Sequence, residues 1–188
     1  MNEIQNIKVI NINESISLKQ IDISDANDIF TTIDSQRNYL GTWLPFVSYT
    51  KSIENTKDFI NKIENTPDEE KEYIFVIKYS SEFAGLIGFK ATDKLNKKTE
   101  IGYWLSEHFQ KKGIITLSVK SLIDFAFNEL ELNRIQIKCA VANIPSRSIP
   151  IRLGFEFEGI ERDGELLNNN IFTDIEVYSL LRSDVRNW

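Results

Sequence analysis

EIGYWLSEHFQKKGIITLSVKSLIDFAF, residues 100–127, predicts a strand, a short loop and a helix in immediate succession. In its first six positions, Ile101, Tyr103 and Leu105 alternate with Glu100, Gly102 and Trp104, as in a strand with two different faces. Apolar residues then recur three and four positions apart, which is the spacing of one helix face. They are Ile115, Val119, Leu122, Ile123, Ala126, Phe127 and Leu130. The rest of the chain is expected to support this unit.

The predicted loop holds Gln110, Lys111, Lys112 and Gly113. A glycine at the start of a helix lets the backbone turn sharply and leaves the first N–H groups, those of residues 112–116, without intrahelical partners. The positive end of the helix dipole and the two lysines would attract an anion there. The pattern therefore favours a site for phosphate groups, and a solvated turn is the alternative.

This segment resembles the acetyl-CoA-binding motif of the GCN5-related N-acetyltransferases (GNAT), Gln/Arg-x-x-Gly-x-Gly/Ala. Gln110 and Gly113 match the motif, and Ile115 departs from its final small residue. The strings EIGYWL and QKKGI resemble the branch of ribosomal-protein-serine/alanine N-terminal acetyltransferases (RimL/RimJ-like). So do LNRIQIKC (132–139), NIPS (143–146), RLGF (152–155), EG (158–159) and VYSLL (177–181). The resemblance is dense from residue 74 to residue 181 and thin before it.

The resemblance implies an α/β (α+β) GNAT fold, with a mixed, mostly antiparallel seven-stranded sheet, a central parallel splayed strand pair and about four helices. The strand-helix-strand order at 100–141 requires a crossover, so the strand at 134–141 is expected beside the strand at 100–105. The pair is expected to splay after Leu105 and near Ala142.

The remaining elements are predicted from periodicity and from turn residues. Ser24 is expected to cap a first helix that ends before Asn38, and Gly154 to follow the last helix. Further helices are predicted at 52–65 and 146–153. Further strands are predicted at 16–20, 73–79, 83–90, 155–160 and 172–181, with polar connections at 68–72 and 93–98.

Composition narrows the class of protein. The chain has 188 residues, 41% of them apolar, and no linker divides it, so one domain is expected over residues 1–188. The formal net charge of −6 and the scattered basic residues argue against nucleic acid as the main ligand. The single cysteine and the absence of a leader pattern or a membrane-length apolar run indicate a cytoplasmic protein with no membrane partner.

Metal chemistry is not expected. One histidine, His108, and one cysteine, Cys139, cannot supply an ordinary zinc site. Cys139 alternates with Ile135 and Ile137 and is predicted to lie in the core.

By resemblance, acetyl-CoA is the cosubstrate, with its diphosphate on the N–H groups of residues 112–116 and its pantetheine arm between the splayed strands. The residues implied to hold it are Trp104, Leu105, Gln110, Lys111, Lys112, Gly113, Ile114, Ile115, Thr116, Asn143, Ser146 and Arg147. For Arg147, a solvated side chain is an equal alternative.

Two catalytic residues are proposed from the sequence. Ser146 is the candidate for hydrogen bonding to the departing sulfur, and its alternative role is the N-cap of the last helix. Glu100 is the candidate base, acting directly or through water, and its alternative is an ion pair with a lysine. The aromatic stretch 39–47 forms either a loop over the core or a wall of the acceptor site, with Trp43 and Phe46 as candidates.

The expected reaction is direct transfer of acetyl from acetyl-CoA to a primary amine, foremost the N-terminal α-amine of a ribosomal or other protein. One alternative is a polyamine or an aminoglycoside-like acceptor, which an acidic pocket formed by residues 68–72, or by Glu158 and Glu161, would favour. Another is a non-enzymatic acyl-CoA sensor. The last hairpin and the aromatic stretch are compatible with a homodimer.

Overall fold

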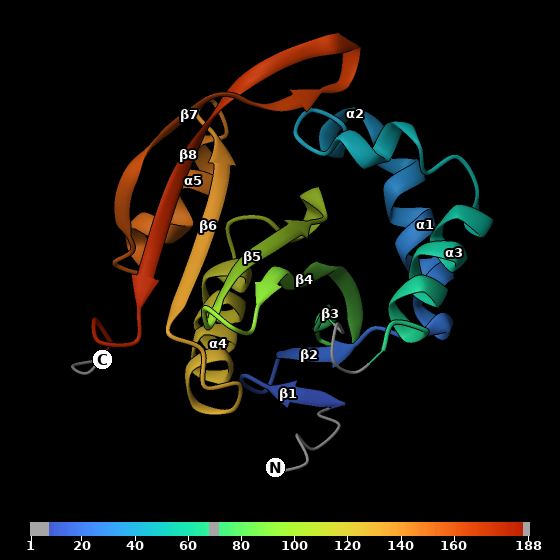
Figure 1. Ribbon diagram of the computed structural model, residues 1–188. Coiled ribbons are helices and arrows are strands. Elements are labelled where there is room, and N and C mark those ends of the chain that lie inside the picture. Colours follow the sequence, from blue (N-terminus) through green and yellow to red (C-terminus); the bar gives the residue numbers. More distant parts are fainter. Residues whose placement is uncertain (1–7, 68–71, 186–188) are drawn as a thin grey trace.

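The computed structural model describes residues 8–67 and 72–185 (Figure 1). Within them, eight strands form one sheet in the order β1-β2-β3-β4-β5-β6-β8-β7. Their bounds are Val9–Asn11 (β1), Ile16–Gln20 (β2), Ile74–Tyr79 (β3), Glu82–Asp93 (β4), Lys98–Leu105 (β5), Arg134–Ala140 (β6), Glu156–Leu167 (β7) and Ile171–Leu181 (β8). The predicted mixed α/β fold is confirmed, with one strand more than the seven expected. The strand that the sequence did not predict is β1, which is only three residues long.

Five α-helices occur in the described residues, against about four predicted. They are Ala26–Ser35 (α1), Arg37–Leu40 (α2), Ile53–Glu64 (α3), Ile114–Asn128 (α4) and Ile144–Arg152 (α5). The extra helix, α2, is a single turn at the start of the aromatic stretch. Short 3₁₀ turns cover Ile23–Asp25 (η1), Pro45–Ser48 (η2), Glu107–Phe109 (η3) and Asn168–Asn170 (η4).

Helices cover both faces of the sheet because successive strand residues point to opposite sides. Phe75 and Ile77 of β3 pack in the same cluster as Leu122 of α4. Val76, between them, packs on the other side with Ile29 of α1 and Ile60 of α3. Figure 1 shows α1 and α3 side by side at one edge of the view and α4 behind the sheet centre. None of the helices in the described segments is long and apolar enough to span a membrane.

The parallel pair β5–β6 is joined over only three residue pairs, from Lys98–Arg134 to Glu100–Gln136. The two strands therefore separate right after Glu100, and the prediction that they splay after Leu105 was wrong in position. Beyond that point β5 continues to pair with β4, and β6 with β8. Past the separation, the Tyr103 hydroxyl of β5 donates to the carbonyl of Ser146 at the start of α5, 3.1 Å away.

Several helix boundaries differ from the sequence prediction. Ser24 does not cap α1: it lies inside η1, whose N-cap is Asp22, and the Ser24 amide donates to the Asp22 carboxylate at 2.8 Å. The last helix begins at Ile144 with Asn143 as N-cap, so the alternative role of Ser146 as the cap is wrong. Gly154 follows that helix with φ of +70°, as predicted.

The two predicted polar connections have different outcomes. Residues 93–98 form the turn of the β4–β5 hairpin, in which Asp93 pairs with Lys98. Residues 68–71 lie outside the described residues. Cys139, by contrast, is 5% exposed and packs in the core with Ile135 and Ile137, as predicted.

Candidate active site

Two cavities meet where β5 and β6 separate. The smaller, about 370 Å³, lies between α2, the start of α4 and α5. The larger, about 710 Å³, lies between the α1–α3 side of the molecule and strands β4 to β7. The residues that line both are Trp43, Leu44, Tyr103, Trp104, Asn143 and Ser146. A ligand reaching from one cavity into the other would therefore pass Ser146.

The smaller cavity is built around the start of α4. Gly113 is the N-cap of this helix and adopts φ of +73°, a left-handed conformation that favours glycine. The N–H groups that follow it have no partner within the helix, and the dipole makes this end positive. All the residues that the sequence assigned to acetyl-CoA line this cavity except Arg147. The geometry suits a diphosphate at the helix start.

Side chains around the cavity are held by specific contacts. The Gln110 amide donates to the hydroxyl of Tyr39 in α2. The Lys112 ammonium lies over the ring of Phe109, 5.1 Å from its centre. On the far side, the Arg152 guanidinium donates to the Thr116 hydroxyl at 2.8 Å. Positive charge thus borders the helix start on two sides.

Ser146 and Tyr103 form a pair at the junction of the cavities. The Asn143 carboxamide accepts the Ser146 backbone N–H at 3.3 Å, which leaves the Ser146 hydroxyl available for other contacts. That hydroxyl lies 3.2 Å from the Tyr103 hydroxyl. Burial raises the pKa of Tyr103 well above its ordinary value, so the phenol stays protonated at neutral pH. The sequence predicted Ser146 but gave Tyr103 only as a strand residue.

Glu100 and Arg147 lie outside the linings of both cavities. The Glu100 carboxylate forms an ion pair with the Lys90 ammonium at 2.8 Å, which is its alternative role from the sequence, and its side chain is 12% exposed. Arg147 pairs with Glu176 at 3.3 Å and is 40% exposed. Their roles as base and as CoA ligand remain predictions.

The larger cavity is lined by acidic groups, but Glu158 and Glu161, which the sequence suggested, are not among them. Glu158 pairs with Arg134, Glu161 pairs with Lys138, and neither glutamate belongs to the lining. The carboxylates of the lining are Asp58, Glu72 and Glu165, and its ammonium groups are Lys90 and Lys138. Of the predicted acidic segment 68–72, only Glu72 belongs to the described residues.

Glu165 is a candidate functional residue that the sequence did not predict. It lies in β7 opposite Thr173, on the side of the larger cavity. Partial burial raises its pKa, the Lys90 ammonium lowers it, and the nearby Glu100 carboxylate raises it. A carboxylate with a raised pKa in a cavity is a candidate proton acceptor. The sequence pattern did not indicate Glu165, because the strand predicted there ended at residue 160, before this position.

Comparison with known proteins identifies this architecture. The family description "Acetyltransferase (GNAT) domain" matches residues 15–156. The chain belongs to the GNAT acetyltransferase family. It is therefore an N-acetyltransferase that uses acetyl-CoA, as predicted.

Individual GNAT relatives cover nearly the whole chain. YdaF of Bacillus subtilis (strain 168) is 37% identical over 179 residues, which is 92% of this chain and 94% of YdaF. The ribosomal-protein-serine acetyltransferase of Escherichia coli (strain K12) is 30% identical over 174 residues, covering 92% and 96%. The solved structure of RimL, a ribosomal L7/L12 α-N-protein acetyltransferase in complex with coenzyme A, superposes with a TM-score of 0.88 at 26% identity, covering 94% and 98%.

Proposed function

We propose that this GNAT enzyme acetylates the N-terminal α-amine of a ribosomal or other protein. The observation that carries the proposal is the 710 Å³ cavity that opens onto Ser146 from the side opposite the α4 site. A cavity of this size holds the first residues of a polypeptide, not only an amino group. The names of two relatives, which act on ribosomal proteins, support the same acceptor class.

In this proposal the cosubstrate lies with its diphosphate on the N–H groups that follow Gly113. Its pantetheine arm runs between β5 and β6, where the strands leave backbone groups unpaired beyond Glu100. An extended arm can pair with such groups as an added strand does. The thioester then reaches the junction beside Ser146 and Tyr103, and the acceptor enters from the larger cavity.

The chemical step is direct transfer. The lone pair of the neutral amine attacks the thioester carbonyl carbon, the C–S bond breaks, and the amine proton passes to a carboxylate. Glu165, or Glu100 through water, is the candidate acceptor of that proton. An α-amine titrates near pH 7.7–8.0, roughly, so it is partly neutral without much help from a base.

The departing thiolate needs a hydrogen-bond donor, and Ser146 is the candidate. Its hydroxyl turns from Tyr103 to the sulfur, while the Tyr103 hydroxyl keeps its bond to the Ser146 carbonyl. Cys139 is unsuited to an acyl-enzyme route. Burial and the Glu176 carboxylate raise its pKa to about 11, so its thiolate is scarce at neutral pH.

The test is release of coenzyme A by the purified protein with a panel of acceptors. We expect release with peptides that have a free N-terminus, and none with the same peptides after N-terminal blocking or with lysine side chains alone. Release with polyamines instead would favour a small-molecule acceptor, which the carboxylates Asp58, Glu72 and Glu165 would suit. Release with polyamines but not with free N-termini, or release with blocked peptides as fast as with free ones, would overturn the proposal.

The Ser146→Ala variant tests the proposed role of Ser146 in catalysis. We expect the variant to bind acetyl-CoA as the wild type does, with kcat lowered about 100-fold. A loss of that size is typical when a hydrogen-bond donor to the reacting atoms is removed. An unchanged kcat in Ser146→Ala would reject the role of Ser146 at the departing sulfur.

A further inference from the structure

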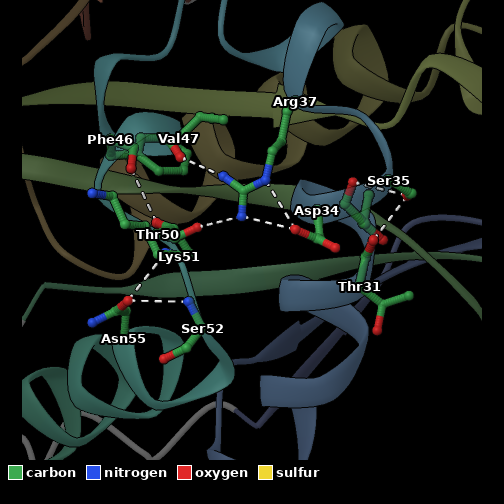
Figure 2. Close-up of polar contacts among 11 residues, drawn as sticks. Thr31, Asp34, Ser35, Arg37, Phe46, Val47, Thr50, Lys51, Ser52 and Asn55 are labelled. Carbon is green, nitrogen blue, oxygen red and sulfur yellow. Dashed lines mark hydrogen bonds and ion pairs between the residues drawn. The ribbon is translucent and has the colours of Figure 1, made fainter.

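The guanidinium group of Arg37 bonds to two carbonyls of the segment 41–50, between α2 and α3. Figure 2 shows the Arg37 side chain reaching from the first residue of α2 into this segment. Arg37 donates to the carbonyl of Val47 at 2.9 Å and to the carbonyl of Thr50 at 2.7 Å. The guanidinium group also forms an ion pair with the Asp34 carboxylate of α1, at 2.9 Å. Arg37 thus fixes two backbone points of the segment relative to α2.

The segment has few other bonds that could hold it in place. It has no strand partner, and its internal hydrogen bonds are short-range turns such as Thr50 N–H to the carbonyl of Phe46. Its other anchors are the Asn168 side chain, which donates to the Gly41 carbonyl at 2.7 Å, and the Val47 side chain, which is 3% exposed. Carbonyl groups at the end of a 3₁₀ turn such as η2 need partners from outside the turn. The Arg37 guanidinium, rigid and always charged, supplies them at two positions.

This segment also carries aromatic side chains at the rim of the larger cavity. Phe46 and Tyr49 line that cavity and not the smaller one. Phe46 is 40% exposed and Tyr49 is 76% exposed. Phe59 of α3 lines the same cavity and is 42% exposed. Exposed aromatic side chains that gather at the mouth of a cavity are typical of a binding surface.

We propose that Arg37 is a positioning residue for the acceptor. By fixing the segment 41–50, it holds Phe46 and Tyr49 where they meet the part of the acceptor chain that lies beyond the reacting amine. The inference rests on the proposed function, since it requires a polypeptide acceptor. It adds that the enzyme selects acceptors by length and by apolar contact a few residues after the N-terminus.

The test compares a dipeptide with a hexapeptide of one sequence, both with free N-termini. In the wild type we expect the hexapeptide to have the higher kcat/KM. Arg37→Gln removes the donors to Val47 and Thr50, and we expect it to raise the KM of the hexapeptide about tenfold. The KM of the dipeptide and the KM of acetyl-CoA should change by about twofold or less.

Two further variants make the test specific. Asp34→Asn is the matched control: it removes the ion pair, keeps the guanidinium and its bonds to both carbonyls, and should leave the length preference intact. Tyr49→Ala changes a side chain that is largely exposed, so it should fold normally and still lose the hexapeptide advantage.

The outcomes are distinct. No turnover of either peptide by the wild type would reject the proposed function. Turnover with a hexapeptide preference that Arg37→Gln and Tyr49→Ala leave unchanged would reject this inference alone. Equal losses in Arg37→Gln and Asp34→Asn would also reject it, because they would trace the effect to the ion pair and not to the carbonyl contacts.

Discussion

At the scale of single residues, Glu165 and Glu100 differ in their surroundings and so should differ in effect. Glu165 lines the larger cavity and has a raised pKa, whereas Glu100 is paired with Lys90 outside the lining. A base works only when deprotonated, so kcat/KM should rise with pH through the raised pKa of Glu165 and again as the amine loses its proton. We expect Glu165→Gln to abolish the first rise and to lower kcat about 100-fold.

The pH profiles of Glu165→Gln and Glu100→Gln, measured with one peptide from pH 5 to 9, check this assignment. We expect Glu100→Gln to keep the wild-type shape. If instead the first rise of kcat/KM with pH is lost in Glu100→Gln and kept in Glu165→Gln, the base is Glu100, as predicted from the sequence.

The residues of the site could be predicted from the sequence to different degrees. Gln110 to Thr116 form one continuous segment, so their pattern was visible, and every one of them lines the smaller cavity. Glu165 and Tyr103 take their places from the pairing of β7 with β8 and from the separation of β5 and β6. Such long-range geometry leaves no local spacing to detect.

At the scale of elements, the start of α4 depends on the backbone conformation of Gly113. A Cβ at this position would meet no atom within 4 Å, so the cost of a substitution comes from φ of +73° and not from a clash. We expect Gly113→Ala to weaken acetyl-CoA binding roughly tenfold, since that conformation costs an alanine about 1–2 kcal/mol. Gly113→Asn should bind more tightly than Gly113→Ala, because asparagine tolerates the left-handed region.

Calorimetric titration of acetyl-CoA into the two variants measures this difference. A greater loss for Gly113→Asn than for Gly113→Ala would mean that side-chain volume at the helix start, not backbone conformation, limits binding. Unchanged affinity in both variants would remove the α4 start from the binding site.

Elements with a long periodic pattern were predicted well, and short ones were not. α4 and the central strand follow from residues 100–127 alone. β1 and α2, of three and four residues, are too short to show a period. The early separation of β5 and β6 escaped prediction because both strands continue as regular strands, each paired on its outer side.

At the scale of the whole molecule, the two cavities connect parts of the chain that are distant in sequence. Figure 1 shows the β7–β8 hairpin reaching across toward α2, and the Asn168 side chain donates to the Gly41 carbonyl at 2.7 Å. Acetyl-CoA in the proposed site between α2, α4 and α5 should therefore stabilise the fold as a unit. At a concentration 100 times its Kd, it should add about 2.7 kcal/mol and raise Tm by about 5–10 °C.

A thermal melt with and without acetyl-CoA measures this shift, and Gly113→Ala at the same ligand concentration should show a smaller one. A wild-type Tm that does not respond to saturating acetyl-CoA would contradict binding to the folded site.

The three residue pairs that join β5 to β6 also determine where the native sheet opens. Each half of the sheet keeps its own ladders, β1 to β5 on one side and β6 to β8 on the other, and α4 connects them. Local opening requires the least free energy where the fewest hydrogen bonds break, so amide hydrogens along this line should exchange with solvent before those of the longer β3–β4, β4–β5 and β6–β8 ladders. The line along which the interior of the sheet opens most easily is thus the line along which the cosubstrate's arm is proposed to enter.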